Sequence, residues 1–477
     1  IQQHIGNPPT PTVKVGDKVL KGQLIAKPKG YISASTHAPS SGTVTAIGES
    51  LVPHASGSTA PCITITTDGL DELHPDCVPI GTAEDMDPTE MRAFIRSAGI
   101  VGLGGATFPT SVKLNVGPHR NIEALVLNGA ECEPYISCDN ALMRQYAPKI
   151  ITGAQILMHA LTTPECIIAL EDHMQEAFDS LSKALEEADD TRIKIVKVPS
   201  IYPEGGERQL LQVLSGQEVP FNGMPIDIGY ICQNVATAVA TDDAFEEGLP
   251  LISRIVTVTG SGIKQPQNLR VRIGTPISAV IQQCGGYSDD ADRVIIGGPM
   301  MGYTVDTDEI PITKSTNCIF APATDEVNVD YKEMPCIRCG DCAQVCPAQL
   351  LPQQLFWHAK SHDFERTQEF GLFDCIECGC CAYVCPSNIP LVQYYRFAKT
   401  EVWSRERHKA TAELSKRRFE DREARLDQAK ADKLDKAAKN KPKALEISTS
   451  QAKQTIADVM RRVEQSEQDS NKGESED

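Results

Sequence analysis

Two short runs of cysteine constrain this chain more than any other feature. Each run has the spacing C-x2-C-x2-C-x3-C and is followed by a Pro, Pro347 in the first run and Pro386 in the second. Thiols at this density and spacing are typical of metal ligands rather than of a disulfide framework, which indicates a reducing compartment, by default the cytoplasm. The eight cysteines are Cys336, Cys339, Cys342 and Cys346 in the first run and Cys375, Cys378, Cys381 and Cys385 in the second.

The repeated spacing is similar to that of bacterial ferredoxins with two 4Fe-4S clusters, which carry one electron each. In that arrangement three closely spaced thiolates surround one cube, and the fourth, on the helix that follows, reaches the neighbouring cube. We therefore expect Cys346 and Cys385 to cross over between the two sites. The predicted ligand sets are Cys336, Cys339, Cys342 and Cys385 for one cluster and Cys375, Cys378, Cys381 and Cys346 for the other.

Zinc is the competing assignment, because C-x2-C pairs also bind zinc. A zinc site needs neither the third Cys at two-residue spacing nor the trailing Cys-Pro, and both runs have both features, so iron–sulfur clusters are favoured. Cys380, beside Cys381, is expected to be a buried free thiol. The scattered cysteines are expected to be small core residues: Cys62, Cys77, Cys166, Cys232, Cys284 and Cys318.

Composition excludes several classes of function. A formal net charge of −18 and an aromatic content of 5% disfavour nucleic acid as a partner, because phosphate binding needs a basic face and base stacking needs aromatic rings. No run approaches the roughly 18 consecutive apolar residues of a membrane-spanning helix, and no secretory signal peptide is expected at the start. At 477 residues the chain exceeds one hydrophobic core, so several domains are expected.

Residues 1–84 are predicted to form a β barrel-sandwich. From about residue 10 to 68, short apolar runs alternate with Gly and Pro turns, which is typical of compact antiparallel β structure. Residues 13–24 and 37–44 resemble the two halves of biotinyl and lipoyl carrier domains. The stretch between them, residues 27–33, lacks the sequence context of the modified lysine, so we expect a structural barrel without a carrier Lys.

The remainder predicts a multidomain α/β protein. Residues 85–250 alternate helix and strand patterns, which indicates an α/β domain with a largely parallel sheet. Helices are expected at 88–97, 141–161 and 174–188, and strands at 123–127, 167–170 and 193–198.

Three further segments follow this α/β domain. Residues 251–330 predict a β-grasp module with a connector, in which a strand at 254–263 precedes a helix at 275–284. Residues 331–399 hold the cysteine runs and predict an α-helical two-cluster domain of the ferredoxin type. Residues 400–477 are rich in Lys, Arg, Glu and Ala, which predicts a charged tail that is helical or disordered.

Three stretches of the α/β segment form a candidate ligand site. Residues 99–110 are rich in Gly, which lets a backbone approach a flat ring or a phosphate, although Thr107 breaks the pattern G-x-G-x-x-G. Residues 127–134 close a predicted strand with two carboxylates, Glu131 and Glu133. Residues 202–208 precede a predicted helix.

Together these stretches resemble the flavin- and NADH-binding subunit of respiratory complex I. That family has a G-x-G-G-A-G-F-P-T loop with a downstream Lys, an N-x-D-E-x-E-P strand end, a G-E-E turn and an N-N-V-E-T helix start. The resemblance implies that Phe108 and Glu133 face the nicotinamide nucleotide and that Glu207 lies near the isoalloxazine ring. It implies that FMN is held by Gly102, Gly104, Gly105, Lys113, Asn128, Glu131, Asn234 and Thr237. The chain departs from the family at Thr107, Ala130, Arg208 and Gln233.

The order of all five segments resembles the RnfC family of the Rnf electron transport complex over roughly residues 1 to 400. The resemblance implies a peripheral subunit on the cytoplasmic side of a bacterial inner membrane. Such a subunit transfers electrons between NAD(H) and ferredoxin-type carriers, and partner subunits couple this transfer to ion translocation.

The implied chemistry combines two kinds of electron transfer. NADH gives a hydride and iron–sulfur clusters accept single electrons, so FMN must stand between them, and no side chain is needed as a catalytic acid or base. Two alternatives stay open: a diaphorase subunit of a complex I-like or hydrogenase complex, which has a single-cluster motif, and a non-enzymatic 4Fe-4S relay whose flavin fold has lost its ligand.

Overall fold

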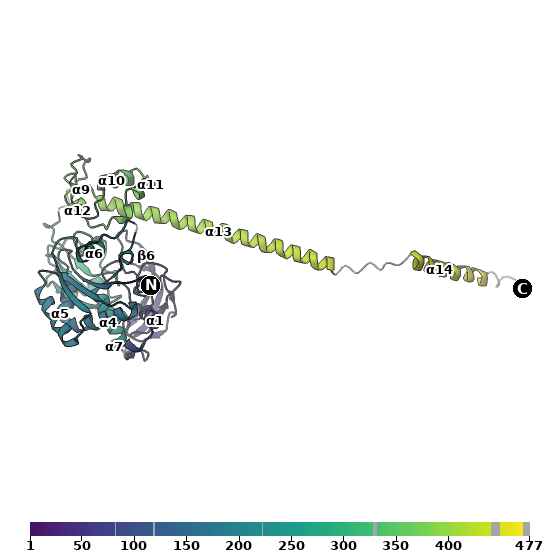
Figure 1. Cartoon of the computed structure of the whole chain (residues 1–477), viewed down its shortest axis with the longest axis horizontal. Helices are drawn as coiled ribbons and strands as arrows, with labels where there is room; N and C mark the ends of the chain where they lie inside the picture. The colour runs from purple at the N-terminus through teal and green to yellow at the C-terminus, as the bar shows by residue number, and fades with distance from the viewer. Residues whose placement is uncertain (82, 118–119, 222, 328–331, 440–448, 471–477) are drawn as a thin grey trace. The chain divides into compact units, whose positions relative to one another are not determined.

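The computed structural model describes residues 1–81, 83–117, 120–221, 223–327, 332–439 and 449–470. The chain divides into two compact units, Ile1–Lys399 and Thr400–Asp477 (Figure 1). The first unit holds two small antiparallel sheets, a parallel sheet, a mixed sheet and the two cysteine runs. The predicted boundary between residues 330 and 331 lies outside the described residues.

Antiparallel β structure forms the N-terminal part, as the sequence predicts. Two three-stranded sheets, ordered β1-β3-β4 and β2-β5-β6, enclose a small core of Val13, Val19, Ile25, Ala38 and Val44. The strands are β1 (Thr10–Pro11), β2 (Lys18–Val19), β3 (Leu24–Lys27), β4 (Thr36–His37), β5 (Gly42–Leu51) and β6 (Thr59–Thr67).

A four-stranded parallel sheet, ordered β10-β7-β8-β9, organises the next part. Its strands are β7 (Ala124–Gly129), β8 (Cys166–Glu171), β9 (Ile193–Val198) and β10 (Tyr230–Asn234). Leu125 and Leu127 face one core and Val126 faces the other, because both faces of a parallel sheet are covered by helices. The carboxyl ends of all four strands meet at one edge, where ligands of open α/β sheets bind.

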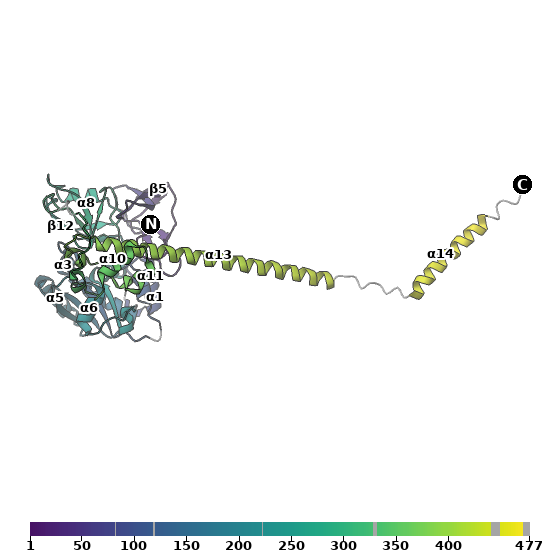
Figure 2. The same ribbon diagram turned by 90° about the horizontal axis from the view of Figure 1, so that it is seen from above.

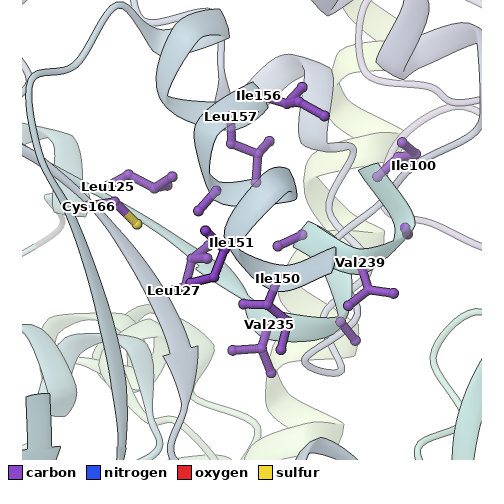
Figure 3. Close-up of a cluster of buried hydrophobic side chains, with 14 of the residues drawn as sticks. Ile100, Leu125, Leu127, Ile150, Ile151, Ile156, Leu157, Cys166, Val235 and Val239 are labelled. Atoms are coloured by element: carbon purple, nitrogen blue, oxygen red, sulfur yellow. The ribbon is translucent and has the colours of Figure 1, made fainter. Parts of the chain in front are cut away.

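Helices cover the two faces of this sheet unequally. Side chains of α1, α3, α4, α5 and α7 share the larger core, and Leu210 and Leu211 of α6 pack on the opposite face. Figure 3 shows the larger core, with labelled side chains of α4 and α7 beside those of β7 and β8. The helices are α1 (Pro88–Ser97), α2 (Thr110–Lys113), α3 (Cys138–Gln145), α4 (Ala147–Leu161), α5 (Gln175–Ala188), α6 (Glu207–Ser215) and α7 (Val235–Glu246), with 3-10 turns η1 (Ala83–Asp85) and η2 (Pro225–Ile228).

The prediction of a single helix at residues 141–161 is wrong in one respect. Two helices, α3 and α4, occupy this region, and they meet at Tyr146, whose φ of −122° and ψ of 27° are not helical. Pro148 lies in the first turn of α4, where a missing amide hydrogen costs nothing, whereas inside a longer helix it would remove a hydrogen bond.

A mixed five-stranded sheet, ordered β12-β11-β15-β13-β14, follows. Helix α8 covers it, and its Ile277, Val280 and Ile281 share a core with Val256 and Val258 of β11. Seen from above, α8 and β12 lie on one side of the first unit and α5 and α6 on the other (Figure 2). The elements are β11 (Ser253–Thr259), β12 (Gln267–Arg272), α8 (Ile277–Gln283), β13 (Val294–Ile296), β14 (Tyr303–Val305) and β15 (Cys318–Phe320).

Short helices carry the cysteine runs. Helices α9 and α12 occupy equivalent places in the two runs, and each begins after a glycine with positive φ, Gly340 at 91° and Gly379 at 83°. In the view of Figure 1, both helices are drawn on the same part of the first unit as α6. The elements are α9 (Asp341–Gln344), α10 (Pro352–Lys360), α11 (Phe364–Glu369), η3 (Leu372–Asp374), α12 (Cys380–Tyr383) and the start of α13 (Leu391–Lys439).

The second unit is helical where the structure describes it. It comprises the rest of α13 and helix α14 (Thr449–Ser470), so the helical alternative for the charged tail is confirmed in these ranges. Side chains from Arg405 to Lys439 are exposed. Among the described residues of the whole chain, every helix is too short or too polar to cross a membrane.

Candidate functional site

The Gly-rich loop closes on itself at the carboxyl edge of the parallel sheet. Val101 and Pro109 form an isolated antiparallel bridge, and the Gly102 amide donates to the Phe108 carbonyl at 2.9 Å. Gly105 has a φ of 118°, which a residue with a side chain rarely adopts, and a Cβ placed there would meet nothing within 4 Å. Gly104 and Gly105 are exposed, so the tip of the loop is open to a ligand.

Unpaired polar groups gather at this loop. Within the described parts of the chain, the backbone amides from Gly104 to Phe108 donate to no acceptor. The hydroxyls of Thr110 and Ser111 and the amide nitrogen of Gln233 are buried and likewise find no partner there. Buried polar groups are normally paired, and a row of free amides suits an anionic ligand. The loop therefore fits a ligand with phosphate and carbonyl oxygens, as FMN has.

Two asparagines tie the strand ends together. Asn128 is the penultimate residue of β7 and Asn234 is the last of β10, and the two are opposite each other in the parallel register. Asn128 donates to the Gly205 carbonyl at 2.8 Å, and the Asn234 side chain caps α7 by accepting from the Ala236 amide at 2.8 Å. Thr237 of α7 accepts from the Leu103 amide at 3.0 Å. These predicted flavin residues are thus brought to one edge with the Gly-rich loop.

Lys113 and Glu207 form an ion pair at this edge. Lys113 Nζ lies 2.5 Å from Glu207 Oε1, and both side chains are partly exposed. Burial by itself lowers the pKa of Lys113, but the Glu207 carboxylate outweighs it and the pKa is raised above its usual range. The lysine therefore keeps its positive charge beside the loop.

Glu131 serves the start of α3. Its carboxylate accepts from the amides of Asp139 and Asn140, at 3.0 Å and 3.1 Å, and from the Cys138 thiol at 3.2 Å. Burial, followed by the nearby Asp139, raises the pKa of Glu131 to about 8. Since both oxygens are engaged with α3, a contact of Glu131 with FMN stays a prediction.

Glu133 joins separate segments of the first unit. Its Oε1 accepts from the amides of Met300 and Met301, at 2.8 Å and 3.0 Å, while Oε2 is buried without a partner among the described residues. Burial raises its pKa. Arg396, at the start of α13, donates to the Met301 carbonyl at 2.8 Å. Phe108, the other residue predicted to face the nucleotide, is half-buried.

The eight cysteines line two cavities in the crossed arrangement. The first cavity has a volume of about 570 Å³. Burial and the neighbouring thiols raise the pKa of Cys381 to about 12, so the thiolates need the positive charge of iron to form together. The first cavity is lined by Cys336, Cys339, Cys342 and Cys385, and the second by Cys346, Cys375, Cys378 and Cys381. These all-thiol donor sets fit 4Fe-4S clusters.

The second cysteine set lies against the flavin candidate site. The Tyr202 hydroxyl donates to the Cys378 carbonyl, and Arg208 of α6 pairs with Asp374 at 2.9 Å. Sequence reasoning missed the role of these three side chains, because their partners are 166 to 176 residues away. Cys378 and Cys381 are buried, whereas Cys339 of the first set is exposed.

The expectations for the other cysteines are partly wrong. Cys380 is half-buried rather than buried, because it stands at the start of the short helix α12. Cys62 and Cys77 are also half-buried, whereas the other four scattered cysteines are core residues as expected.

Comparison with known proteins identifies four domains. Residues 1–70 match the RnfC barrel sandwich hybrid domain, residues 95–243 the Nuo51 FMN-binding domain, residues 255–304 the SLBB domain and residues 329–389 the 4Fe-4S dicluster domain. These matches confirm the predicted fold class and the predicted FMN and 4Fe-4S binding.

A likeness to a solved NAD+-reducing [NiFe]-hydrogenase in its air-oxidized state is remote. The identity is 19%, the TM-score is 0.47, and 67% of this chain and 61% of that chain are covered.

Curated relatives are much closer. A protein from Pseudomonas aeruginosa is 48% identical over 89% of this chain, and one from Rhodobacter capsulatus is 45% identical over 78% of it; both are named as the C subunit of an ion-translocating oxidoreductase complex. A protein from Clostridium ljungdahlii, named as the C subunit of a proton-translocating ferredoxin:NAD(+) oxidoreductase complex, is 41% identical over 78% of this chain. The chain covers 54% of the Pseudomonas protein, 71% of the Rhodobacter protein and 81% of the Clostridium protein. On this evidence the chain belongs to the RnfC family, the C subunits of ion-translocating oxidoreductase complexes.

Proposed function

We propose that this chain oxidises NADH and passes the electrons, through FMN and two 4Fe-4S clusters, toward a ferredoxin-type carrier, as a peripheral subunit of an ion-translocating membrane complex. The reverse direction uses the same sites. The other subunits of the complex couple the transfer to ion movement, and the chain lies on the cytoplasmic side of the bacterial inner membrane. The names of the relatives support this role, since one of them mentions ferredoxin and NAD(+).

One observation carries the proposal: the edge that bears the candidate flavin residues touches the second cysteine set directly. Tyr202 precedes Gly205 by three residues and donates to the Cys378 carbonyl. Arg208 follows Glu207 and pairs with the mostly buried Asp374, one residue before Cys375. A separate ferredoxin module would need no such attachment to a flavin fold.

The residues of this chain bind and orient rather than take part in bond-making. The amides of Gly104 to Phe108 and the Lys113 ammonium would hold the flavin, while Asn128, Asn234 and Thr237 fix the strand and helix ends around it. Bound FMN would supply the conversion between the two-electron chemistry of a nicotinamide and the one-electron chemistry of the clusters. Glu207 and Glu133 place negative charge at the same edge, and Phe108 offers a ring for stacking against the nucleotide.

The composition of the purified chain tests this proposal. An anaerobic preparation should contain about eight irons and about eight sulfides, as two 4Fe-4S clusters require, together with one FMN for each chain. Four irons would favour the complex I-like or hydrogenase diaphorase alternative, which the family membership and the eight-cysteine set already disfavour. Iron without flavin would favour the relay alternative.

A non-enzymatic relay has one specific observation in its favour. The carboxylates of Glu131 and Glu133 are engaged with the amides of α3 and of Met300 and Met301. If these bonds persist in solution, the nucleotide must bind through other groups. A chain that acts only as a relay oxidises no NADH, whereas the proposed function predicts NADH oxidation that Glu133→Gln slows while both clusters are retained.

A further inference from the structure

Two buried cations lie behind the Gly-rich loop. Arg254, in β11, is 5% exposed, and Lys314, between β14 and β15, is 1% exposed. Neither belongs to a recognisable motif, and neither forms part of the site described above. Buried cations are rare, because removing a charge from water costs free energy unless ion pairs or hydrogen bonds offset it.

Both cations hold carbonyl groups at the entry to the loop. Lys314 Nζ donates to the Gly99 carbonyl at 2.6 Å and to the Ser35 carbonyl at 3.1 Å. Arg254 donates to the Leu103 carbonyl at 3.2 Å and also to the Lys314 carbonyl, so the two residues act on one stretch of chain. Residues 99 to 103 are therefore fixed at both ends from the same side.

These hydrogen bonds fix the direction of the first free amide of the loop. In a trans peptide unit the C=O and the following N–H point in opposite directions. Because the Leu103 carbonyl faces Arg254, the Gly104 amide hydrogen faces away from Arg254. The Leu103 amide already donates a hydrogen bond to the Thr237 hydroxyl. Gly104 thus starts the row of amides that find no acceptor within the described residues.

The two cations differ in their surroundings. Burial lowers the pKa of Arg254, and the neighbouring Cys138, Asp139 and Glu131 oppose this lowering. Lys314 forms no ion pair with a carboxylate in the described part of the chain. Its charge acts on His4, His37 and the amino group of Ile1, which are all basic, and Arg254 donates a hydrogen bond to its backbone carbonyl. Burial lowers the pKa of Lys314 to about 7, so a nearby anion would favour its charged form.

We propose that Arg254 and Lys314 are positioning residues for the flavin, which turn the free amides of the loop toward it and place positive charge behind its anionic groups. This inference rests on the proposed function, because it assumes that FMN binds at the loop. It assigns a flavin-binding task to the segment that forms the five-stranded sheet.

Flavin affinity of the full chain, with its clusters present and its FMN removed, tests the inference. Lys314→Met and Arg254→Gln should each weaken FMN binding at least about tenfold, measured by quenching of flavin fluorescence, because a hydrogen bond to a charged group is lost. Arg254→Lys should recover part of the affinity. Arg270→Gln is the matched control, since Arg270 pairs with Asp243 and Ser253 and does not touch the loop; it should change the affinity less than about twofold.

The pH dependence of FMN binding distinguishes an effect of the Lys314 charge from an effect of its side-chain shape. The ratio of the FMN dissociation constants of Lys314→Met and the unaltered chain should be largest at pH 6 and should shrink above pH 7, where Lys314 loses its charge in the unaltered chain. A ratio that is constant with pH, or affinities equal to that of the control, would overturn the inference. Loss of iron from Lys314→Met would indicate that this variant does not fold. The pH dependence of FMN binding to the unaltered chain is then the test, and an FMN affinity that is flat from pH 6 to 8.5 would contradict the inference. Failure of the unaltered chain to bind FMN at all would overturn the proposed function as well.

Discussion

At the scale of single residues, buried acids at the candidate site set the response to pH. Glu131 has a pKa raised to about 8, first by burial and then by Asp139. An acid whose pKa is higher in the folded state binds its proton more tightly there. Its contribution to stability is therefore complete below the unfolded pKa of 4.5 and is lost as pH rises toward 8.

The variant Glu131→Gln should remove much of this pH dependence, because glutamine resembles the protonated acid. The thermal midpoint of the unaltered chain should fall between pH 5 and 8, and that of the variant should fall less. Thermal unfolding followed by circular dichroism at several pH values measures both. Parallel declines in the two proteins would mean that other groups dominate.

Single cysteines test the crossed ligand sets. Cys385 lines the cavity of the first run, so Cys385→Ala should lower the iron content from about eight to about four and leave the cluster of the second run in place. Cys380→Ala is the control and should keep all the iron. Loss of the cluster bound by Cys375, Cys378 and Cys381 in the Cys385 variant would show that the ligands do not cross.

Residue roles could be predicted where a motif encodes them and not where a distant partner does. The cysteine sets follow from spacing alone, since a cluster imposes its own geometry. Glu133 accepts from the amides of Met300 and Met301, which lie 167 and 168 residues further along the chain. No local sequence pattern predicts these contacts. Arg254 and Lys314 were missed for the same reason, because isolated basic residues carry no sequence signature.

At the scale of elements, α6 and the 3-10 turn η3 link the candidate flavin edge to the second cysteine set. Arg208 of α6 is about one-third exposed, and Asp374 of η3 is 9% exposed. Asp374 Oδ2 has no partner among the described residues. The ion pair with Arg208 is therefore the main interaction that offsets the burial of the Asp374 carboxylate. Removal of the arginine would leave a carboxylate mostly buried and unpaired.

Arg208→Met should therefore destabilise the chain by about 1–3 kcal/mol, the usual cost of an unsatisfied buried group. Lys183→Met is the control, since Lys183 and Glu187 form an exposed pair on α5, and such pairs contribute about 0.5 kcal/mol or less. Denaturant unfolding of the cluster-loaded chain compares the two. Equal stability of both variants would contradict a structural role for the Arg208–Asp374 pair.

Most elements of the parallel sheet could be predicted from hydrophobic periodicity. Helix α1 and strand β9 have the predicted bounds, Pro88–Ser97 and Ile193–Val198. The break between α3 and α4 was missed, because the apolar spacing continues through Tyr146 while the backbone does not. Periodicity reports which face is buried and not whether the backbone stays helical.

At the scale of the whole molecule, the cofactor sites and the charged tail belong to different units. The predicted flavin and cluster residues all lie in Ile1–Lys399. Described side chains of α13 from Arg405 onward are exposed, so they add little buried apolar area.

Truncation after Ala410 should therefore leave FMN and iron contents unchanged and shift the thermal midpoint by no more than a few degrees. The full chain prepared in parallel is the control. Loss of either cofactor from the truncated chain would show that the tail supports the sites.

Direct electron transfer from NADH to the clusters tests the central claim most sharply. The oxidised, cofactor-loaded chain is titrated with NADH under anaerobic conditions, and reduced clusters are followed by electron paramagnetic resonance. Reduced-cluster signals should appear with NADH in the unaltered chain and disappear when FMN is removed, although dithionite still reduces the clusters. Clusters that dithionite reduces and NADH does not, in a chain that retains its FMN, would contradict the claim.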